Sequence, residues 1–361
     1  MHVRYQMRLR PPISESDSDV SAFAAERSAL RRTSVVCALP EPSAPITISL
    51  MAKHVLLCPP DFFDVTERKN PYMLEHGPVD HAKAERQWQA LRSALEQAGC
   101  LVETIPPVSG LEDMVFAANQ AFVGFHEQVG NFIVPSRMVH ASRQREVPFY
   151  VDWYRQHGFK VIEADLGADH LEGHGDLLWQ PDWSRIYAGY GFRSTCGGVE
   201  KFREAMSKLG IPVVPLRLVD PFCYHLDTCF CPLNNEAVLI YPGAYAPESL
   251  TTLRGFWQRV HELTIEEAHK FMGNGIVVNG RYLTPYLTPH LEAILREEEL
   301  TPVVLDTSEF EKSGGSLFCM KAFLPWAREG RRNSMHHCSD SRHDQSHHAE
   351  HNPEVPEDSS A

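Results

Sequence analysis

The chain has 361 residues, of which 43% are hydrophobic and 10% aromatic, and this composition suffices to bury the core of one or two globular domains. Its formal net charge of −13 argues against the nucleic-acid-binding class, because binding to phosphate backbones requires clustered Lys and Arg. No apolar run reaches the roughly 18 residues of a membrane helix. Nine cysteines without a CxxC pair predict neither a disulfide scaffold nor a zinc cage. These properties are typical of an enzyme from a reducing, cytosol-like compartment.

The two ends of the chain differ from its middle in composition. Residues 1–50 are rich in Ser, Ala, Pro and Arg without a sustained apolar period, and residues 327–361 include six histidines among Ser, Asp, Glu and Pro. Since neither segment can build a core, we predict a disordered N-terminal extension, one catalytic domain at residues 51–326 and a disordered His-rich tail. We interpret the histidines as part of a solvated tail and not as a metal site.

The first residues give conflicting indications of location. Three arginines within the first ten residues are compatible with a mitochondrial presequence. Three acidic residues between positions 15 and 19 oppose one, because such peptides are poor in acidic residues. The cytoplasm is therefore the preferred location, with the mitochondrion as the alternative.

Short apolar runs alternate with amphipathic stretches through the predicted domain, which indicates an α/β protein. The motifs GxGxxG and GxxxxGK[ST] are both missing, so nucleotide-binding folds lose their main support and no cofactor is expected. The predicted strands are His54–Cys58, Leu101–Ile105, Ala121–Val123, Asn131–Pro135, Lys160–Ala164, Ile186–Gly189, Pro212–Leu216, Ala237–Tyr241, Ile276–Val278 and Val303–Asp306, and the predicted helices span residues 78–98, 142–157, 199–209, 247–257, 265–271 and 287–298.

Four short segments carry the residue types of catalysis. In the first, Asp113 and Asn119 lie six positions apart beside an apolar strand, where either is a turn residue or a ligand-binding residue. In the second, polar residues alternate from Asp169 to Asp176, and glycines allow close approach of a backbone or ligand. Glu172 in this segment is a candidate for holding a cationic group.

A metal site in the second segment is chemically conceivable. Histidine nitrogens and carboxylates are ordinary metal ligands, and the candidates would be His170, Glu172, His174 and Asp176. The spacing matches no metallohydrolase motif such as HExxH. We therefore expect no metal here.

The third segment, Tyr224–Cys231, contains a histidine and an aspartate two positions apart. A strand would place His225, Asp227 and Cys229 on one face, because side chains alternate with period two. At about 3.3 Å per residue, Cys229 would lie on the order of 13 Å from His225 along this strand. A thiol partner for His225 must then come from elsewhere in the fold. The alternative is a core strand whose histidine has no catalytic role.

Cys319, in the fourth segment, follows a Ser-Gly-Gly turn. An isolated cysteine before apolar residues is more often buried and inert than catalytic. A thiol, an imidazole and several carboxylates within one chain nevertheless describe covalent catalysis on a small substrate.

Taken together and in this order, the four segments resemble the guanidino-group-modifying (amidinotransferase) superfamily. That superfamily contains arginine deiminase, glycine amidinotransferase, dimethylarginine dimethylaminohydrolase and the arginine dihydrolases. The resemblance covers about residues 51–326, and the stretches that carry it are Leu111–Asn119, Glu172–Asp176, His225–Thr228 and Ser313–Cys319. It implies a five-bladed α/β propeller (pentein) with the active site in its central channel, an arrangement that periodicity alone does not predict.

The similarity is closest to the arginine dihydrolase group. Deiminases and dimethylarginine hydrolases typically carry an aspartate where this chain has Asn119, and dimethylarginine hydrolases generally lack the carboxylate of Asp227. The motifs shared with the dihydrolases are Phe63-Asp64-Val65, Asn70-Pro71-Tyr72-Met73, Ala118-Asn119 and the string His225–Leu233. Dimethylarginine dimethylaminohydrolase and amidinotransferase activities stay open as alternatives. Transfer cannot be separated from hydrolysis by sequence, because water access to the intermediate decides between them.

The resemblance assigns a role to each candidate residue. Cys319 would attack the guanidine carbon to form a covalent thiouronium, and His225 would act first as an acid and then as a base. Glu172 and Asp227 would hold the guanidinium of arginine or a close analogue by charge-assisted hydrogen bonds. The residues implied to bind the amino-acid end of the substrate are Arg137 and Arg193, for its carboxylate, with Asp113 and Asn70.

Asn119 supports a sharper hypothesis. If the first hydrolysis produces citrulline, the next substrate is a neutral ureido group whose oxygen is a poor neighbour for a carboxylate. An amide can donate a hydrogen bond to that oxygen, so Asn119 would retain the intermediate for a second hydrolysis to ornithine.

An alternative hypothesis is that the protein is not an enzyme but a member of this superfamily that binds arginine without converting it. A broken Cys-His-Glu set would indicate it, and Cys319, His225 and Glu172 are all present. The sequence leaves the oligomeric state open, a homo-oligomer included.

Overall fold

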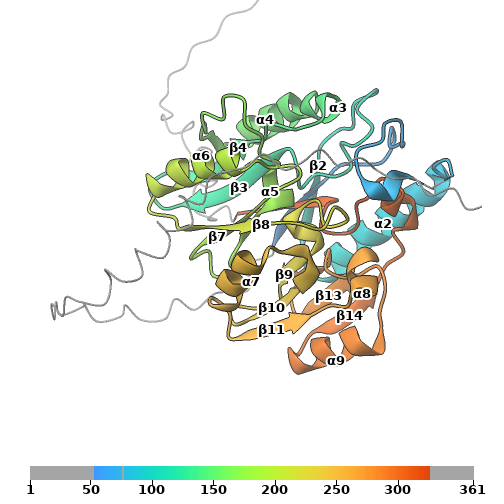
Figure 1. The fold of residues 1–361 in the computed structure, drawn as a ribbon. Helices are drawn as coiled ribbons and strands as arrows, with labels where there is room; N and C mark the ends of the chain where they lie inside the picture. Colours follow the sequence, from blue (N-terminus) through green and yellow to red (C-terminus); the bar gives the residue numbers. More distant parts are fainter. Residues whose placement is uncertain (1–52, 75–76, 326–361) are drawn as a thin grey trace, which may run out of the picture. The chain divides into compact units, whose positions relative to one another are not determined.

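The computed structural model describes residues 53–74 and 77–325 (Figure 1). The predicted N-terminal extension and His-rich tail lie outside these residues. The strands are β1 (His54–Leu57), β2 (Leu101–Thr104), β3 (Ala121–His126), β4 (Gly130–Pro135), β5 (Lys160–Val161), β6 (Leu177–Trp179), β7 (Ile186–Tyr190), β8 (Val213–Arg217), β9 (Phe230–Pro232), β10 (Ala237–Ile240), β11 (Arg259–Glu262), β12 (Ile276–Val278), β13 (Arg281–Thr284), β14 (Thr301–Val304) and β15 (Lys321–Leu324).

Short and long helices connect these strands. The longest, α2, begins after Asp80, whose side chain accepts a hydrogen bond from the Lys83 backbone N–H. Its buried face repeats at helical spacing through Trp88, Leu91 and Leu95. The α-helices are α2 (His81–Gln97), α3 (Ala141–Gln144), α4 (Val147–Gln156), α5 (Gly173–Asp176), α6 (Cys196–Ser207), α7 (Pro247–Arg254), α8 (Ile265–His269), α9 (Pro289–Glu297) and α10 (Ser308–Glu311), and the 3-10 turns are η1 (Pro71–Leu74), η2 (Leu226–Thr228) and η3 (Pro242–Ala244).

Five three-stranded sheets in the described chain share one plan. In each, the central strand pairs antiparallel with one neighbour and parallel with the other. Four sheets use consecutive strands, namely β3-β4-β5, β6-β7-β8, β9-β10-β11 and β12-β13-β14. The fifth, β15-β1-β2, joins the two ends of the domain, with His54 opposite Leu324. This is the five-bladed α/β propeller that the resemblance implied.

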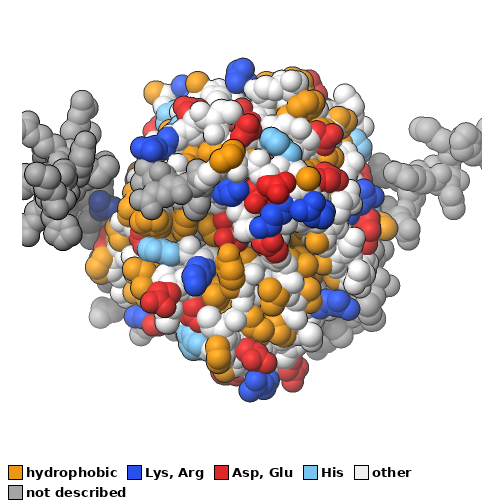
Figure 2. All heavy atoms as spheres, turned by 90° about the vertical axis from the view of Figure 1, so that its right-hand side faces the viewer, with side chains coloured by type: hydrophobic (Ala, Val, Ile, Leu, Met, Phe, Trp, Pro, Cys, Tyr) orange, Lys and Arg blue, Asp and Glu red, His pale blue; other side chains and the backbone are white. Residues whose placement is uncertain are grey.

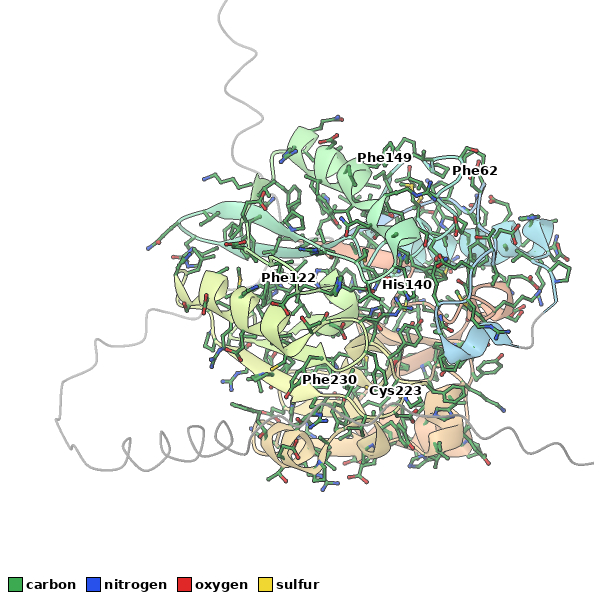
Figure 3. All side chains as sticks on the ribbon, turned by 45° about the horizontal axis from the view of Figure 1, so that its top comes forward. Phe62, Phe122, His140, Phe149, Cys223 and Phe230 are labelled. Carbon is green, nitrogen blue, oxygen red and sulfur yellow. The ribbon has the colours of Figure 1, made fainter. Side chains whose placement is uncertain are left out.

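Five buried hydrophobic clusters hold neighbouring blades together. One packs Val55 and Leu91 of the first blade against Ile276 and Leu283 of the last, which closes the ring of blades. The other four join the remaining neighbours in the same way. Aromatic side chains differ in exposure between strands and outer helices. Phe122 of β3 lies inside the fold, whereas Phe149 of α4 is 44% exposed (Figure 3).

The antiparallel outer strands of the five sheets are β3, β6, β9, β12 and β15, and we call them the first strands because each begins its blade. A short polar segment precedes each first strand. Asn119, Asn274 and Cys319 each stand two residues before the first residue of such a strand. Helix α5 leads into β6 and turn η2 leads into β9. We call these five stretches the lead-in segments.

Each of the ten predicted strands and six predicted helices overlaps an observed element of the same type. Strands β6, β9, β11, β13 and β15 were not among the predicted ones. The helix predicted at 142–157 is divided into α3 and α4, and Pro148 stands in the first turn of α4.

Two segments whose residues alternate with period two form tight turns where a strand was considered. Residues 173–176 form helix α5, which starts at Gly173 with a φ of 45°, a left-handed conformation that favours glycine. Residues 226–228 form the 3-10 turn η2, so the strand in this segment begins only at Phe230. Both segments therefore approach the axis of the ring as tight turns.

Within the described residues, no helix combines the length and the apolar character required to span a bilayer. On the face drawn in Figure 2, Lys and Arg side chains are interspersed with Asp and Glu.

Candidate active site

The five lead-in segments are hydrogen-bonded to one another in a closed ring. Each contact joins one segment to the next around the propeller, so the polar side chains of all five blades are held at one end of the axis. The contacts are His174 N–H to Ala118 O (2.8 Å), Leu226 N–H to Asp176 Oδ1 (3.1 Å), Asn274 Nδ2 to Asp227 O (2.9 Å), Phe318 N–H to Asn274 O (3.0 Å) and Ala118 N–H to Cys319 O (3.0 Å).

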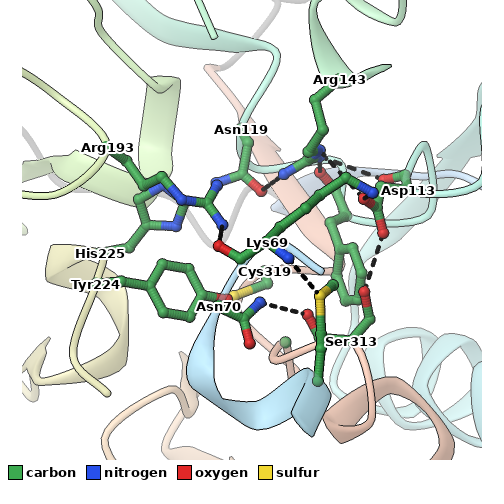
Figure 4. A pocket seen from close by; sticks show the side chains of 13 residues that line it. Lys69, Asn70, Asp113, Asn119, Arg143, Arg193, Tyr224, His225, Ser313 and Cys319 are labelled. Carbon is green, nitrogen blue, oxygen red and sulfur yellow. Dashed lines mark hydrogen bonds and ion pairs between the residues drawn. The ribbon is translucent and has the colours of Figure 1, made fainter. Parts of the chain in front are cut away.

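A cavity lies at this end of the ring (Figure 4). Its free volume is about 20 Å³, which is room for little more than one water molecule. Its lining residues come from positions far apart in the chain: Lys69, Asn70, Met73, Asp113, Phe116, Asn119, Arg143, Arg193, Tyr224, His225, Ser313, Gly315 and Cys319.

The thiol of Cys319 is buried beside a carboxyl group. Its Sγ donates to Asp227 Oδ2 at 3.1 Å and accepts a hydrogen bond from Asn274 Nδ2 at 3.2 Å. Burial, and secondly Asp227, raise the pKa of Cys319 well above its usual value. Burial also raises the pKa of Asp227 to about 7. The sulfur therefore holds its proton until a cation enters the cavity.

His225 is oriented by Glu172. The Nε2 of His225 lies 2.9 Å from Glu172 Oε2, and Arg193 Nη1 donates to the same oxygen at 3.1 Å. Glu172 Oε1 accepts a hydrogen bond from the Val139 backbone N–H at 2.9 Å. Burial alone would raise the pKa of Glu172, but Arg193 and His225 outweigh it and hold this pKa far below its usual range. Glu172 is therefore an anion, and the side chains of Arg193 and His225 both contact it.

A second group of polar and charged residues lies where the amino-acid end of the substrate was predicted to bind. Asp113 Oδ2 lies 3.0 Å from Lys69 Nζ, and Asp113 Oδ1 accepts from Ser313 Oγ at 3.0 Å. Asn70 Nδ2 donates to the Ser313 carbonyl at 2.9 Å, and Asn70 Oδ1 accepts from the Tyr72 N–H. Asp113 and Asn70 are thereby brought to the same side of the cavity.

Asn119 presents a free donor. Arg143 Nη1 donates to Asn119 Oδ1 at 3.0 Å, and since a guanidinium cannot accept, this contact fixes which end of the amide faces Arg143. The Nδ2 of Asn119 is buried and has no hydrogen-bond partner among the described residues. Arg143 itself is buried and paired with Glu146 at 3.1 Å.

The two predicted substrate-binding arginines are placed differently. Arg193 is buried and lines the cavity, with its guanidinium 4.7 Å from the ring centroid of Tyr224 and its Nη2 donating to the Lys69 carbonyl. Arg137 lies outside the cavity, contrary to the prediction. It is exposed between the buried residues Ser136 and Met138, because alternation along this extended stretch turns it outward.

Three of the four residues considered as metal ligands, Glu172, His174 and Asp176, have other partners. His174 Nε2 accepts from the Val123 N–H at 3.0 Å, and its Nδ1 lies 3.0 Å from the Leu177 carbonyl. Burial lowers the pKa of His174 to about 3, so its imidazole is neutral. Asp176 accepts from Ser194 through Oδ2 and from the Leu226 N–H through Oδ1. These side chains connect blades rather than converge on a common point.

Sequence reasoning missed three groups of the site: Lys69 and Arg143, which line the cavity, and Asn274, which donates to the Cys319 thiol. Asn274 had a usable signal, because it stands between two glycines directly before a predicted strand, as Asn119 stands before Ala121. Lys69 and Arg143 had none, since a buried cation is recognised only once its anionic partners are located.

Comparisons with known proteins find similar sequences over most of the described domain. The family model described as N,N dimethylarginine dimethylhydrolase, eukaryotic, matches residues 65–324. The chain is 33% identical over 272 residues to the bifunctional arginine dihydrolase/ornithine cyclodeaminase ArgZ of Synechocystis sp., covering 74% of this chain and 37% of that protein. It is also 33% identical over 268 residues to the N(G),N(G)-dimethylarginine dimethylaminohydrolase of Mycobacterium tuberculosis, covering 74% of this chain and 84% of that protein.

A solved structure shares the fold. The N-terminal domain of an ArgZ variant, covalently bonded to a reaction intermediate, aligns with a TM-score of 0.70 and 30% identity, covering 76% of this chain and 98% of that domain. The chain therefore spans 37% of the length of the full cyanobacterial protein and nearly all of its solved N-terminal domain.

Proposed function

The chain belongs to the guanidino-group-modifying superfamily, as its match to the eukaryotic dimethylarginine dimethylhydrolase model over residues 65–324 shows. From this premise we propose that it is a cysteine-dependent hydrolase of the guanidino group of arginine. The catalytic domain would be residues 51–326. One observation carries the proposal: Cys319 and His225 line one buried cavity, Asp227 is hydrogen-bonded to the Cys319 thiol and Glu172 to the His225 ring, although these groups come from three different blades.

Substrate binding would begin with an exchange of partners. The cavity has no room for a guanidino amino acid while Arg193 occupies the side of Glu172. The substrate guanidinium offers Glu172 a replacement cation, and the substrate carboxylate offers Arg193 a replacement anion. Arg193 would thus contribute to recognition by releasing Glu172, which keeps each buried charge paired throughout.

The chemistry would follow from the arrival of that cation. A guanidinium beside Cys319 and Asp227 favours loss of the thiol proton. The thiolate would attack the guanidine carbon, the C–N bond would break as His225 gives a proton to the departing ammonia, and a thiouronium would remain on Cys319. His225 would then take a proton from the water that attacks this carbon, and cleavage of the C–S bond would release citrulline.

Asn119 and Asp227 support arginine as the substrate. The Oδ1 of Asp227 is buried without a hydrogen-bond partner among the described residues, so it is free to accept from an unsubstituted guanidinium N–H. The unpaired Nδ2 of Asn119 can donate to the ureido oxygen of citrulline. Retained in this way, citrulline would undergo a second hydrolysis to ornithine, carbon dioxide and ammonia.

Dimethylarginine hydrolysis is the second candidate function, favoured by the family model and by the mycobacterial relative. It would release dimethylamine and stop at citrulline. A methylated nitrogen offers no N–H to Asp227, so this substrate makes less use of the observed acceptor.

Incubation of the purified full chain with arginine, dimethylarginine or citrulline, followed by amino-acid and amine analysis, tests the proposal. We expect ornithine and about two ammonia per arginine. Citrulline with one ammonia would limit the activity to a single round, and dimethylamine in place of ammonia would establish the second candidate. Absence of turnover on all three substrates, in a protein that binds arginine, would reject the enzyme class. The Cys319→Ser protein is the matched inactive control.

The redox state of the described chain is relevant to location. The thiols of Cys58, Cys100, Cys223, Cys229, Cys231 and Cys319 are free, which supports a cytoplasmic location as part of this proposal.

A further inference from the structure

A second cavity lies at the opposite end of the first strands from the catalytic cavity. Its volume is about 480 Å³, far larger than that of the catalytic cavity. Every blade contributes a wall residue from its first strand: Val123, Trp179, Cys231, Val277 and Phe323. The two cavities share no lining residue, and both lie within the ring formed by the first strands and their lead-in segments.

This second cavity holds a buried lysine. Lys321 is 1% exposed, and its Nζ lies 3.1 Å from the ring centroid of Phe318 and 4.4 Å from that of Phe323. Within residues 53–74 and 77–325, its ammonium forms no ion pair, and the carboxyl group that most favours its charge is that of Asp227, which belongs to the catalytic site. An unpaired buried ammonium is costly, and burial lowers the pKa of Lys321 to about 7.

The charge of the cavity wall has one sign. The described residues that line it include Lys53 and Lys321 but no Asp or Glu, in a chain whose net charge is −13. Lys53 Nζ lies 5.3 Å from the ring centroid of Phe323, on which Lys321 also rests. An anion entering the cavity would meet two cations and no repelling carboxylate, whereas a cationic guanidino compound would be repelled.

The remaining wall is aromatic and apolar. Trp179 and Trp183 lie with ring centroids 4.9 Å apart, and Trp183 is 39% exposed. Phe318 and Phe323 stand beside the lysine. Flat rings favour a flat apolar ligand body, and the volume lies within the range of about 300–1,000 Å³ that is typical of small-molecule sites.

We propose that this second cavity is a binding site for a small aromatic carboxylate, with the carboxylate on Lys321 and the ring against the aromatic wall. The site is separate from the catalytic cavity, and the proposal does not depend on the proposed enzymatic function.

Calorimetric titration of the full chain near pH 6 with naphthalene-2-carboxylate tests this proposal, with naphthalene-2-carboxamide as the uncharged control of the same shape. We expect one saturable site for the carboxylate and binding of the carboxamide weaker by at least about tenfold, which corresponds to about 1.4 kcal/mol. Binding should also weaken at pH 9, where Lys321 loses its charge. Equal affinity for the acid and the amide, or no saturable binding, would overturn the proposal.

Variants locate the site. Lys321→Met should weaken carboxylate binding by at least about tenfold, and the exposed Lys208→Gln should leave it unchanged. Since Lys321→Met could disturb folding, Trp183→Ala at the exposed wall provides an independent variant that should weaken both the acid and the amide. Saturating arginine should not displace the naphthalene-2-carboxylate. Displacement by arginine, or unchanged affinity in both wall variants, would place the binding elsewhere and contradict the proposal.

Discussion

At the scale of single residues, the site is defined by a buried pair of acidic groups. The sulfur of Cys319 and the carboxyl group of Asp227 are 3.1 Å apart and buried together, so the two cannot both be anionic without a nearby cation. The neutral thiol is the resting state of this pair. A cationic substrate changes that balance, and reactivity therefore depends on occupancy of the site.

Asp227→Asn should change how stability depends on pH. Burial raises the pKa of Asp227 to about 7, so between about pH 4 and 7 the folded protein holds a proton that the unfolded chain releases. Its contribution to stability is therefore lost as pH rises through this range. Compared with Asp227→Asn, the parent should lose roughly 2–4 kcal/mol between pH 5 and pH 8. Urea unfolding at both pH values measures this, and parallel pH dependence in the two proteins would contradict the assignment.

Asn119→Asp should stop the proposed reaction after one hydrolysis. The aspartate would still accept from Arg143 but would have no N–H for the ureido oxygen of citrulline. Ammonia released per arginine should fall from about two to about one, with citrulline accumulating. The exposed Asn235→Asp is the matched control and should keep the parent ratio. An unchanged ratio in the Asn119→Asp protein would remove Asn119 from the second step.

At the scale of the element, helix α5 connects the blades that carry Asn119 and His225. It is only four residues long, and its glycines allow it to lie directly against the neighbouring lead-in segments. A Cβ on Gly173 would stand 2.6 Å from the Asn119 carbonyl oxygen. Gly175 occupies the position before β6 at which other blades carry Asn119, Asn274 or Cys319. The absence of a side chain there leaves room for the ring of His225.

Gly175→Ala should impair catalysis more than folding. The added Cβ would stand 2.4 Å from Asn119 Nδ2 and 3.1 Å from His225 Cδ2, so both side chains must shift. A displacement of about 1 Å at a catalytic group can cost about 100-fold in rate, and we expect kcat to fall by roughly that factor. Gly77→Ala, whose Cβ meets nothing within 4 Å, is the control. Parent-like kcat in the Gly175→Ala protein would show that the site tolerates the shift.

At the scale of the whole molecule, the propeller is closed by its own ends. Strand β15 pairs with β1, and these two strands lie at opposite ends of the described chain. Cys319 stands at the entrance to β15, so the proposed nucleophile reaches the cavity only when the ring is complete. Closure of the fold and assembly of the site are therefore the same event.

Ala322→Asp tests the contribution of this closure to stability. Ala322 is fully buried opposite Leu56 and packs in the cluster between the first two blades. An aspartate there would be buried without a partner, and we expect a loss of at least about 3 kcal/mol. Val304→Asp, on the 54%-exposed end of β14, should change stability by less than about 0.5 kcal/mol. Thermal unfolding of both variants measures the difference, and similar melting temperatures would show that β15 adds little to the closed ring.

The sequence by itself determined the local elements and indicated the proposed reacting groups. Period-two and helical spacing are local properties, so His54–Leu57 and α2 were predictable from their own residues. The motif order pointed to Cys319, His225, Glu172 and Asp227, and the structure brings these four together.

The tertiary structure alone decided how these groups are paired. It placed Arg143 in the cavity and Arg137 outside it. It also brought Asn274 within hydrogen-bonding distance of the Cys319 thiol and paired β15 with β1. These features depend on contacts between residues far apart in the chain, and the apolar or polar character of a single residue does not specify its distant neighbour. A buried charge such as Lys321 is recognised as unpaired only when every surrounding blade is in position.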